Sequence, residues 1–151
     1  CKTASLIANS ARAAGVLSDC SPTELDGLYR FGRQLGLAFQ VVDDILDFTG
    51  SDQQLGKPAA SDLASGYLTA PTFYAMEEHP GLQALISREF AEPGDLDDAL
   101  EMVRSSRAIA RTRELAETFA SESRDSIGWM KDSASKRALL ELPDFVLSRL
   151  Y

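Results

Sequence analysis

The sequence contains few of the residues that common catalytic and metal sites require. The single histidine, His79, precedes Pro80 at an expected helix end, which excludes a histidine-based triad or zinc site. The two cysteines, Cys1 and Cys20, form no CxxC pair and no metal-ligand spacing, and we interpret them as reduced thiols of an intracellular protein. Glycine-rich phosphate loops of the Walker or Rossmann type do not occur.

Long apolar runs and an excess of positive charge are also missing. No apolar run approaches the roughly 18 to 20 residues of a transmembrane helix. Fifteen Lys and Arg residues against 23 Asp and Glu residues give a net charge of −8, which argues against non-specific nucleic-acid binding. The 151 residues, 44% of them hydrophobic, fit one globular domain. Because the chain starts at Cys1 without an initiator methionine or signal peptide, we interpret it as a processed, cut or partly covered chain.

Helix signals dominate and strand signals are scarce. Residues 2–14 favour a helix that ends at Gly15, and Ser21-Pro22-Thr23-Glu24 resembles a capping box for a long helix reaching about Phe48. Three glycines inside this long helix indicate a closely packed neighbouring helix: Gly27, Gly32 and Gly36. A loop is expected over 49–60, followed by helices over 62–65, 71–78, 82–90, 95–104, 109–130 and 135–150, the last bent near Pro143. The prediction is an all-α protein formed as one piece.

An acidic stripe inside the long helix is the strongest chemical signal. Asp43 and Asp47 are one turn apart, as are Gln40 and Asp44, so the four side chains share one side of the helix. Like charges at this spacing repel, and the neighbouring residues are mostly apolar, so the carboxylates favour a bound cation. Oxygen ligands of this kind suit Mg²⁺, which commonly uses one or two carboxylates together with a substrate phosphate.

The alternative interpretation is a solvated acidic face, although three aspartates in mid-helix disfavour it on helix propensity. Two lysines could accompany the stripe: Lys2, beside Thr3 at the chain start, and Lys57, in the loop after the stripe. A second acidic group, Asp97-Asp98 with Glu101, follows Pro93-Gly94-Asp95, and we interpret it as the ordinary first turn of a helix that Asp95 caps.

These motifs together resemble a known family. Gly36-x-x-Phe39-Gln40-x-x-Asp43-Asp44-x-x-Asp47 resembles the second aspartate-rich motif of the trans-isoprenyl diphosphate synthases. Lys2-Thr3 resembles the pair that precedes that motif, and Leu55-Gly56-Lys57-Pro58 through Asp62-Leu63 resembles the segment that follows it. The sequence from Gly56 to Pro71 most resembles the long-chain, solanesyl-type enzymes of plastids and cyanobacteria, which make quinone side chains. The resemblance implies the C-terminal half of an isoprenoid-synthase helical bundle with a central cavity.

The resemblance also implies roles for individual residues. Asp43, Asp44 and Asp47 would bind Mg²⁺ that bridges to an allylic diphosphate, which Lys2 and Lys57 would contact as it leaves. Thr3 and Gln40 would direct their oxygens at the developing allylic cation, and Phe39 would complete the substrate-binding set. Isopentenyl diphosphate would then add head-to-tail and extend the chain by one C5 unit.

Two features depart from the family pattern. The first aspartate-rich motif with its paired arginines is not in this sequence, so half of the metal site and most of the isopentenyl diphosphate site are expected on another segment or a partner chain. Tyr67 stands where many relatives have a lysine. The alternative function is therefore a non-catalytic helical subunit or binding module of a heteromeric synthase. A head-to-head synthase is disfavoured by the Gly56-Lys57-Pro58 segment.

Assembly and location follow from the resemblance alone. It implies a homodimer or heterodimer and the plastid stroma, with the cytoplasm as the alternative. Product length, the preferred allylic primer and the presence of a transit peptide stay open at this point.

Overall fold

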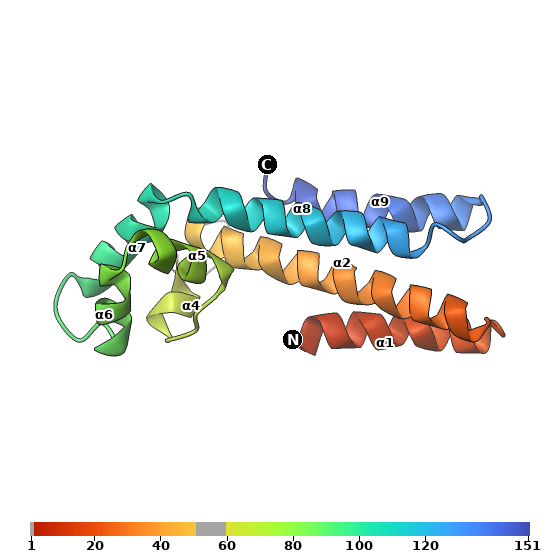
Figure 1. Cartoon of the computed structure of the whole chain (residues 1–151), viewed down its shortest axis with the longest axis horizontal. Helices are drawn as coiled ribbons and strands as arrows, with labels where there is room; N and C mark the ends of the chain where they lie inside the picture. Colours follow the sequence, from red (N-terminus) through yellow and green to blue (C-terminus); the bar gives the residue numbers. More distant parts are fainter. Residues whose placement is uncertain (1, 51–59) are drawn as a thin grey trace. The chain divides into compact units, whose positions relative to one another are not determined.

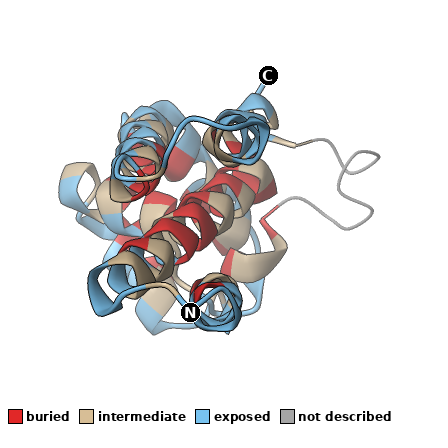
Figure 2. Ribbon diagram, turned by 90° about the vertical axis from the view of Figure 1, so that its right-hand side faces the viewer, coloured by how far each residue is buried: buried red, intermediate tan, exposed pale blue. Residues whose placement is uncertain are grey.

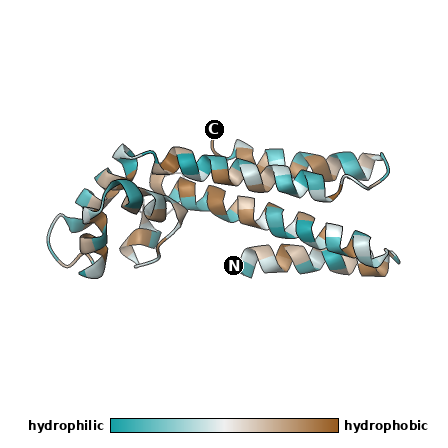
Figure 3. Cartoon of the chain, in the orientation of Figure 1, coloured by the Kyte–Doolittle hydropathy of each residue, from teal (hydrophilic) through white to brown (hydrophobic). Residues whose placement is uncertain are grey.

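All regular secondary structure in the described residues, 2–50 and 60–151 of the computed structural model, is helical (Figure 1). The helices are α1 (Lys2–Leu17), α2 (Pro22–Thr49), α4 (Ser61–Ala64), α5 (Ala70–Glu78), α6 (Gly81–Ser87), α7 (Asp95–Ser105), α8 (Ala108–Ser126) and α9 (Ala134–Ser148). The predicted all-α class is confirmed. Hydrophilic and hydrophobic residues alternate along these helices (Figure 3), and none of the helices in the described ranges has the length and apolar character needed to cross a membrane.

The chain forms two compact units. The first contains Cys1–Val42 and Leu115–Tyr151, and thus α1, most of α2, most of α8 and α9. The second contains Asp43–Glu114, and thus the last turns of α2, helices α4 to α7 and the start of α8.

Close packing of α1 against α2 organises the first unit. A Cβ atom added at Gly32 would lie 2.8 Å from the Cα of Ala8, and one added at Gly36 would lie 2.6 Å from the Cα of Ala4. These distances are shorter than real Cβ contacts, so only glycine lets the two backbones approach this closely. The expectation that another helix packs against these glycines is confirmed.

Gly15 corrects one expectation, because it does not end the first helix. Helix α1 continues to Leu17, and Gly15 is buried inside it. An added Cβ atom would lie 2.6 Å from the side chain of Leu28 and 2.8 Å from that of Leu25. The left-handed residue after the helix is instead Asp19, at φ 53°. Gly15 therefore serves helix packing, a role that a local sequence signal does not distinguish from that of a C-terminal glycine.

The start of α2 matches the predicted capping box. The backbone N–H of Ser21 donates to Oε2 of Glu24 at 2.7 Å, and the N–H of Glu24 lies 3.5 Å from Oγ of Ser21. The side-chain hydrogen bond from Ser21 lowers the pKa of the Glu24 carboxyl below its ordinary value. These interactions satisfy N–H groups that have no partner within the helix.

Side chains of α8 join this helix to α2 and α9. Oγ of the buried Ser123 donates to the carbonyl oxygen of Phe31 at 3.1 Å, and Arg124 pairs with Asp144 of α9 at 2.8 Å. Buried residues line the inner sides of the helices and exposed residues the outer sides (Figure 2). α9 contains the buried Pro143 within its length.

The second unit has its own apolar core. Its largest buried side chains come from α2 and from helices α4, α6 and α7, namely Phe48, Leu63, Leu82 and Val103. Ion pairs join Glu77 and Glu78 of α5 to Arg111 and Arg107 respectively. The Arg104 guanidinium donates to the carbonyl oxygen of Phe48 at 3.4 Å.

Asp95 corrects a second expectation. The N-cap of α7 is Gly94, with φ 95°, and Asp95 is the first residue of the helix. Its buried carboxylate accepts hydrogen bonds from Nε and Nη2 of Arg88, at 2.7 and 2.5 Å, and from the N–H of Glu92 at 3.1 Å. Asp95 therefore ties the end of α6 to the start of α7. Asp97 and Asp98 are exposed first-turn acids, as expected.

Candidate functional site

The acidic stripe lies at the C-terminal end of α2, where exposure falls along the helix. Asp43 is half-buried, Asp44 is 8% exposed and Asp47 is 2% exposed. Ile45, which lies between Asp44 and Asp47, and Phe48, which follows Asp47, are buried in the apolar interior. The helical spacing predicted from the sequence is therefore realised, and the carboxylates are more buried than a solvated acidic face would be.

Asp47 accepts hydrogen bonds from three consecutive residues, Ala60, Ser61 and Asp62, at the start of α4. Its Oδ1 accepts a hydrogen bond from Oγ of Ser61, and its Oδ2 accepts one from the N–H of Asp62, both at 3.1 Å. Its backbone carbonyl accepts from the N–H of Ala60 at 2.7 Å. The end of α2 and the start of α4 are thus joined through this one aspartate.

The donor set at the end of α2 fits a hard cation. Asp43 and Asp44 offer carboxylate oxygens, which are the ligands that Mg²⁺ prefers, and Mg²⁺ commonly takes one or two of them while phosphate and water complete its octahedron. No cluster of three or more potential metal-ligating side chains forms within the described parts of the chain. We therefore consider Asp43 and Asp44 a partial site, whose remaining ligands would come from substrate, water or other protein segments.

The packing of α1 on α2 determines which turn of α2 lies beside Lys2 and Thr3. Gly32 meets Ala8 and Gly36 meets Ala4, so the helices are antiparallel, and each step forward along α2 is one step back along α1. This register puts Lys2 and Thr3 level with the turn of α2 that holds residues 37–40. Lys2 is exposed, while Thr3, Phe39 and Gln40 are half-buried. These four predicted residues therefore lie at one end of the α1–α2 pair.

A further cation at this level was missed by the sequence analysis. The guanidinium carbon of Arg149, just after α9, lies over the ring of Phe39 at 4.6 Å from the ring centre. Contacts of this kind are attractive because the ring face is electron-rich. One sequence signal could have drawn attention to it, since Arg149 is the only basic residue after Arg137.

The predicted site residues that the structure describes are divided between the two compact units. Lys57 lies outside the described residues. The aspartates belong to the second unit, and Lys2, Thr3, Phe39 and Gln40 belong to the first. Phe39 and Gln40 are nevertheless on the same continuous helix as the aspartates.

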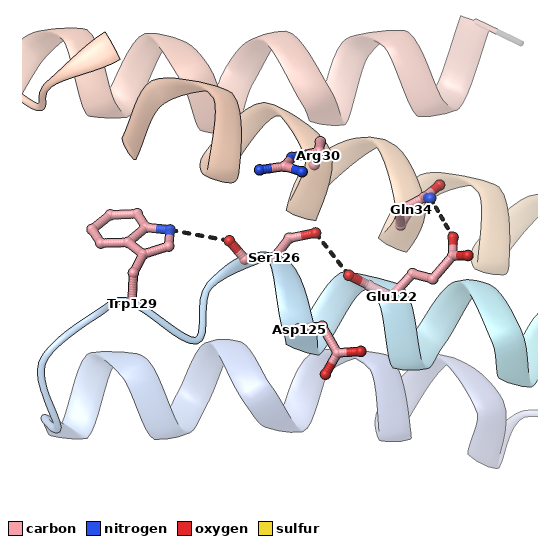
Figure 4. A pocket seen from close by; sticks show the side chains of 6 residues that line it. All are labelled: Arg30, Gln34, Glu122, Asp125, Ser126 and Trp129. Carbon is pink, nitrogen blue, oxygen red and sulfur yellow. Dashed lines mark hydrogen bonds between the residues drawn. The ribbon is translucent and has the colours of Figure 1, made fainter. Parts of the chain in front are cut away.

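The first unit also contains a hollow of about 530 Å³ that includes none of the predicted site residues. It lies between α2 and α8 (Figure 4) and is lined by Arg30, Gln34, Glu122, Asp125, Ser126 and Trp129. Gln34 donates a short hydrogen bond to Glu122, and the indole N–H of Trp129 donates to the carbonyl oxygen of Ser126 at 3.0 Å. Trp129 is 43% exposed, so it lies at the surface of the unit and not in its core.

One protein family matches most of the chain. The family model described as polyprenyl synthetase matches residues 1–103. A prenyl transferase of Synechocystis sp. is 57% identical over 150 residues, which are 99% of this chain and 46% of that protein. Solanesyl diphosphate synthase 2, chloroplastic, of Arabidopsis thaliana is 45% identical over 99% of this chain and 36% of its own length. The hexaprenyl pyrophosphate synthase of Saccharomyces cerevisiae mitochondria is 45% identical over 98% of this chain and 32% of its length.

Solved structures give the same result. An Arabidopsis medium/long-chain length prenyl pyrophosphate synthase in its apo form matches with a TM-score of 0.88 and 41% identity, over 99% of this chain and 52% of that chain. The heptaprenyl diphosphate synthase of Staphylococcus aureus matches with a TM-score of 0.92 and 30% identity, over 99% of this chain and 48% of that chain. The chain thus spans between about a third and a half of the length of these relatives.

Proposed function

The chain belongs to the polyprenyl synthetase family, and from that premise we propose that it forms part of a Mg²⁺-dependent trans-polyprenyl diphosphate synthase. The reaction would join isopentenyl diphosphate head-to-tail to an allylic diphosphate. The C–O bond to the diphosphate breaks, the new C–C bond forms at the allylic carbon, and a proton leaves the added C5 unit.

Charge neutralisation is the main task of the polar residues in this proposal. Bound Mg²⁺ would neutralise the leaving diphosphate, and Asp43 and Asp44 would hold it, with Asp47 grouped with them by the family resemblance. Lys2 and Lys57 would supply further positive charge to the same diphosphate through charge-assisted hydrogen bonds. Loss of Asp43, Asp44, Lys2 or Lys57 should slow ionisation of the allylic substrate more than it weakens binding of its hydrocarbon chain.

Phe39, Thr3 and Gln40 would act on the hydrocarbon part of the same allylic substrate. Oxygens of Thr3 and Gln40 would stabilise positive charge on the allylic carbons, because an oxygen dipole aimed at developing charge lowers the barrier. The apolar side chains around them would keep water from trapping the cation.

One observation carries the proposal: the α1–α2 register brings Lys2 and Thr3 level with Phe39 and Gln40. These residues are far apart in sequence, and the proposed reaction needs them at one allylic diphosphate.

The finer features of the function are likewise proposals. The names of the relatives, solanesyl and hexaprenyl synthases, support a long-chain product. We propose use of that product as a quinone side chain and a location in the plastid stroma, because plant relatives are named chloroplastic and another relative is cyanobacterial. A dimer, formed with a second copy or a related chain, is proposed on the family resemblance.

Elongation of labelled isopentenyl diphosphate by the full-length protein tests the proposal. The assay supplies an allylic primer and Mg²⁺ and measures the chain length of the product. Asp43→Ala should reduce incorporation by 100-fold or more, while Asp97→Ala, which removes an exposed first-turn acid of α7, should leave it within twofold.

Equal rates for Asp43→Ala and the unsubstituted protein would refute the assignment of the stripe. If the protein binds the allylic diphosphate with Mg²⁺ but elongates it only when an active partner chain is added, the non-catalytic subunit is the correct alternative.

A further inference from the structure

We infer that Asp47 is a positioning residue, which fixes the start of α4 against the end of α2, and that the metal is held by the other two aspartates of the stripe. The inference rests on the proposed function and divides the three aspartates between two tasks. It departs from the family resemblance, which groups Asp47 with the metal ligands.

The hydrogen bonds of Asp47 give the first argument. Both carboxylate oxygens accept hydrogen bonds from α4, Oδ1 from Oγ of Ser61 and Oδ2 from the N–H of Asp62. The carbonyl oxygen accepts a third bond, from the N–H of Ala60. A carboxylate that holds a backbone N–H and a hydroxyl at 3.1 Å is already oriented by the protein.

The start of α4 needs such a partner. Its N-cap residue is Ala60, whose side chain cannot accept a hydrogen bond, so the first N–H groups of the helix have no local cap. Ala60 also adopts the left-handed conformation, φ 54° and ψ 33°, which is unfavourable for a residue with a Cβ atom. The carboxylate of Asp47 takes the place of the missing N-cap side chain, and the bond from Ala60 to its carbonyl holds the strained residue in place.

Asp47 is the most buried of the three aspartates. It is 2% exposed, and the next residue, Phe48, packs into the same apolar cluster as Ala60 and Leu63. Asp43 is half-buried and is the most exposed of the three. A metal with bound water and diphosphate needs accessible oxygens, and Mg²⁺ commonly uses one or two protein carboxylates. Exposure falls from Asp43 through Asp44 to Asp47, so Asp47 is the least accessible of the three to a hydrated metal.

Amide hydrogen exchange at Asp62 in the metal-free, full-length protein tests the inference directly. The N–H of Asp62 donates a hydrogen bond to Oδ2 of Asp47, so the exchange rate of this amide reports on that bond. Asp47→Ala should accelerate exchange at this amide at least tenfold. Asp47→Asn, whose amide oxygen can still accept from the Asp62 N–H while its NH₂ group donates to Ser61, should change the rate by less than threefold. Asp98→Asn, an exposed acid in the first turn of α7, is the matched control and should leave it unchanged.

The Mg²⁺ concentration for half-maximal elongation gives the second readout. It should stay within twofold of the unsubstituted value in Asp47→Asn and should rise at least tenfold in Asp43→Asn. An unchanged Asp62 exchange rate in Asp47→Ala, or a tenfold rise in the Mg²⁺ requirement of Asp47→Asn, would overturn the inference. If the unsubstituted protein does not elongate at all, the proposed function fails, while the exchange experiment still decides the role of Asp47.

A milder variant covers the case in which Asp47→Ala does not fold. Ser61→Ala removes one hydrogen-bond donor to the Asp47 carboxylate and touches none of the proposed metal ligands. It should raise the exchange rate at Asp62 two- to fivefold, and an unchanged rate would contradict the positioning role.

Discussion

The guanidinium of Arg149 lies over the ring of Phe39, 4.6 Å from its centre, and joins the end of α9 to α2. Both side chains are half-buried, so the contact is partly shielded from water, which strengthens a cation–π interaction. Phe39 is next to Gln40 in the proposed substrate site. Arg149 therefore connects the C-terminal residues of the chain to that site.

A double-mutant cycle should measure this contact. The cycle measures the free energy of unfolding in denaturant for four proteins: the unsubstituted protein, Phe39→Leu, Arg149→Gln and the double variant. We expect a coupling free energy of about 1 kcal/mol, because the cation–ring attraction exists only when both side chains are present. Arg149→Lys should retain part of it. A coupling free energy indistinguishable from zero would show that the contact contributes nothing to stability.

Alanine in place of Gly36 should destabilise the first unit. The new Cβ atom would lie 2.6 Å from the Cα of Ala4, and two helix backbones would have to separate to accommodate it. We expect a loss of about 1 to 3 kcal/mol in the free energy of unfolding.

Gly81→Ala is the matched control for that substitution. At the start of α6 an added Cβ atom meets its nearest neighbour, the terminal methyl of Met102, at 3.9 Å. Alanine favours helix more than glycine does, so this variant should be neutral or slightly more stable. Equal destabilisation by both substitutions would contradict the close packing of α1 on α2.

Trp129 should report on the hollow between α2 and α8. It is the single tryptophan, and its indole lies where a Cβ atom at Gly27 would come within 2.5 Å of Nε1. Gly27→Ala should displace the ring, break its hydrogen bond to Ser126 and shift the fluorescence emission to longer wavelength. The emission spectrum of Gly81→Ala should match that of the unsubstituted protein. No shift in Gly27→Ala would mean that the ring does not rest on α2.

The pair of Arg88 and Asp95 should make stability depend on pH in the acid range. The hydrogen bond from Arg88 holds the pKa of the Asp95 carboxyl below its ordinary value of 3.8. Because the folded state has the lower pKa, the unfolded state binds the proton more readily. The pair therefore stabilises the fold fully above pH 3.8, and this contribution is lost as the pH falls through the lower folded-state pKa.

Thermal unfolding of Asp95→Asn between pH 7 and pH 2 should test this. The midpoint of the variant should lie below that of the unsubstituted protein at pH 7, and the difference should shrink as the pH falls below 3.8. Asp97→Asn removes an exposed acid from the same helical turn and should show a much smaller difference at pH 7. A difference for Asp95→Asn that is constant over the whole range would rule out an electrostatic role for the pair.

Local interactions in the chain determined the helices and their approximate limits. Hydrophobic periodicity, the Ser21–Glu24 capping box and the breaks at Pro80 and Gly94 act within a few residues, so the sequence alone shows where helices start and stop. Helix α2 ends at Thr49, one residue from its predicted end. The spacing of Asp43, Asp44 and Asp47 likewise follows from the geometry of a single helix.

Tertiary packing decided what several of these residues do. Gly15 has the sequence signature of a helix end, but it lies against Leu25 and Leu28 inside α1. Asp95 resembles an N-cap, but its carboxylate is bound by Arg88. Each of these roles depends on a neighbour from another helix, and the neighbour is fixed only when the apolar faces have packed.

The site shows the same division. The sequence alone identified Lys2, Thr3, Phe39, Gln40 and the aspartates as candidate site residues. Their types, spacing and order along the chain can be read without the structure. The contact of Arg149 with Phe39, and the hydrogen bonds of Asp47 to Ser61 and Asp62, join segments that are between 14 and 110 residues apart in sequence. No local pattern encodes which of three similar carboxylates faces a helix start and which faces outward, since burial and hydrogen-bond partners arise only from the folded arrangement.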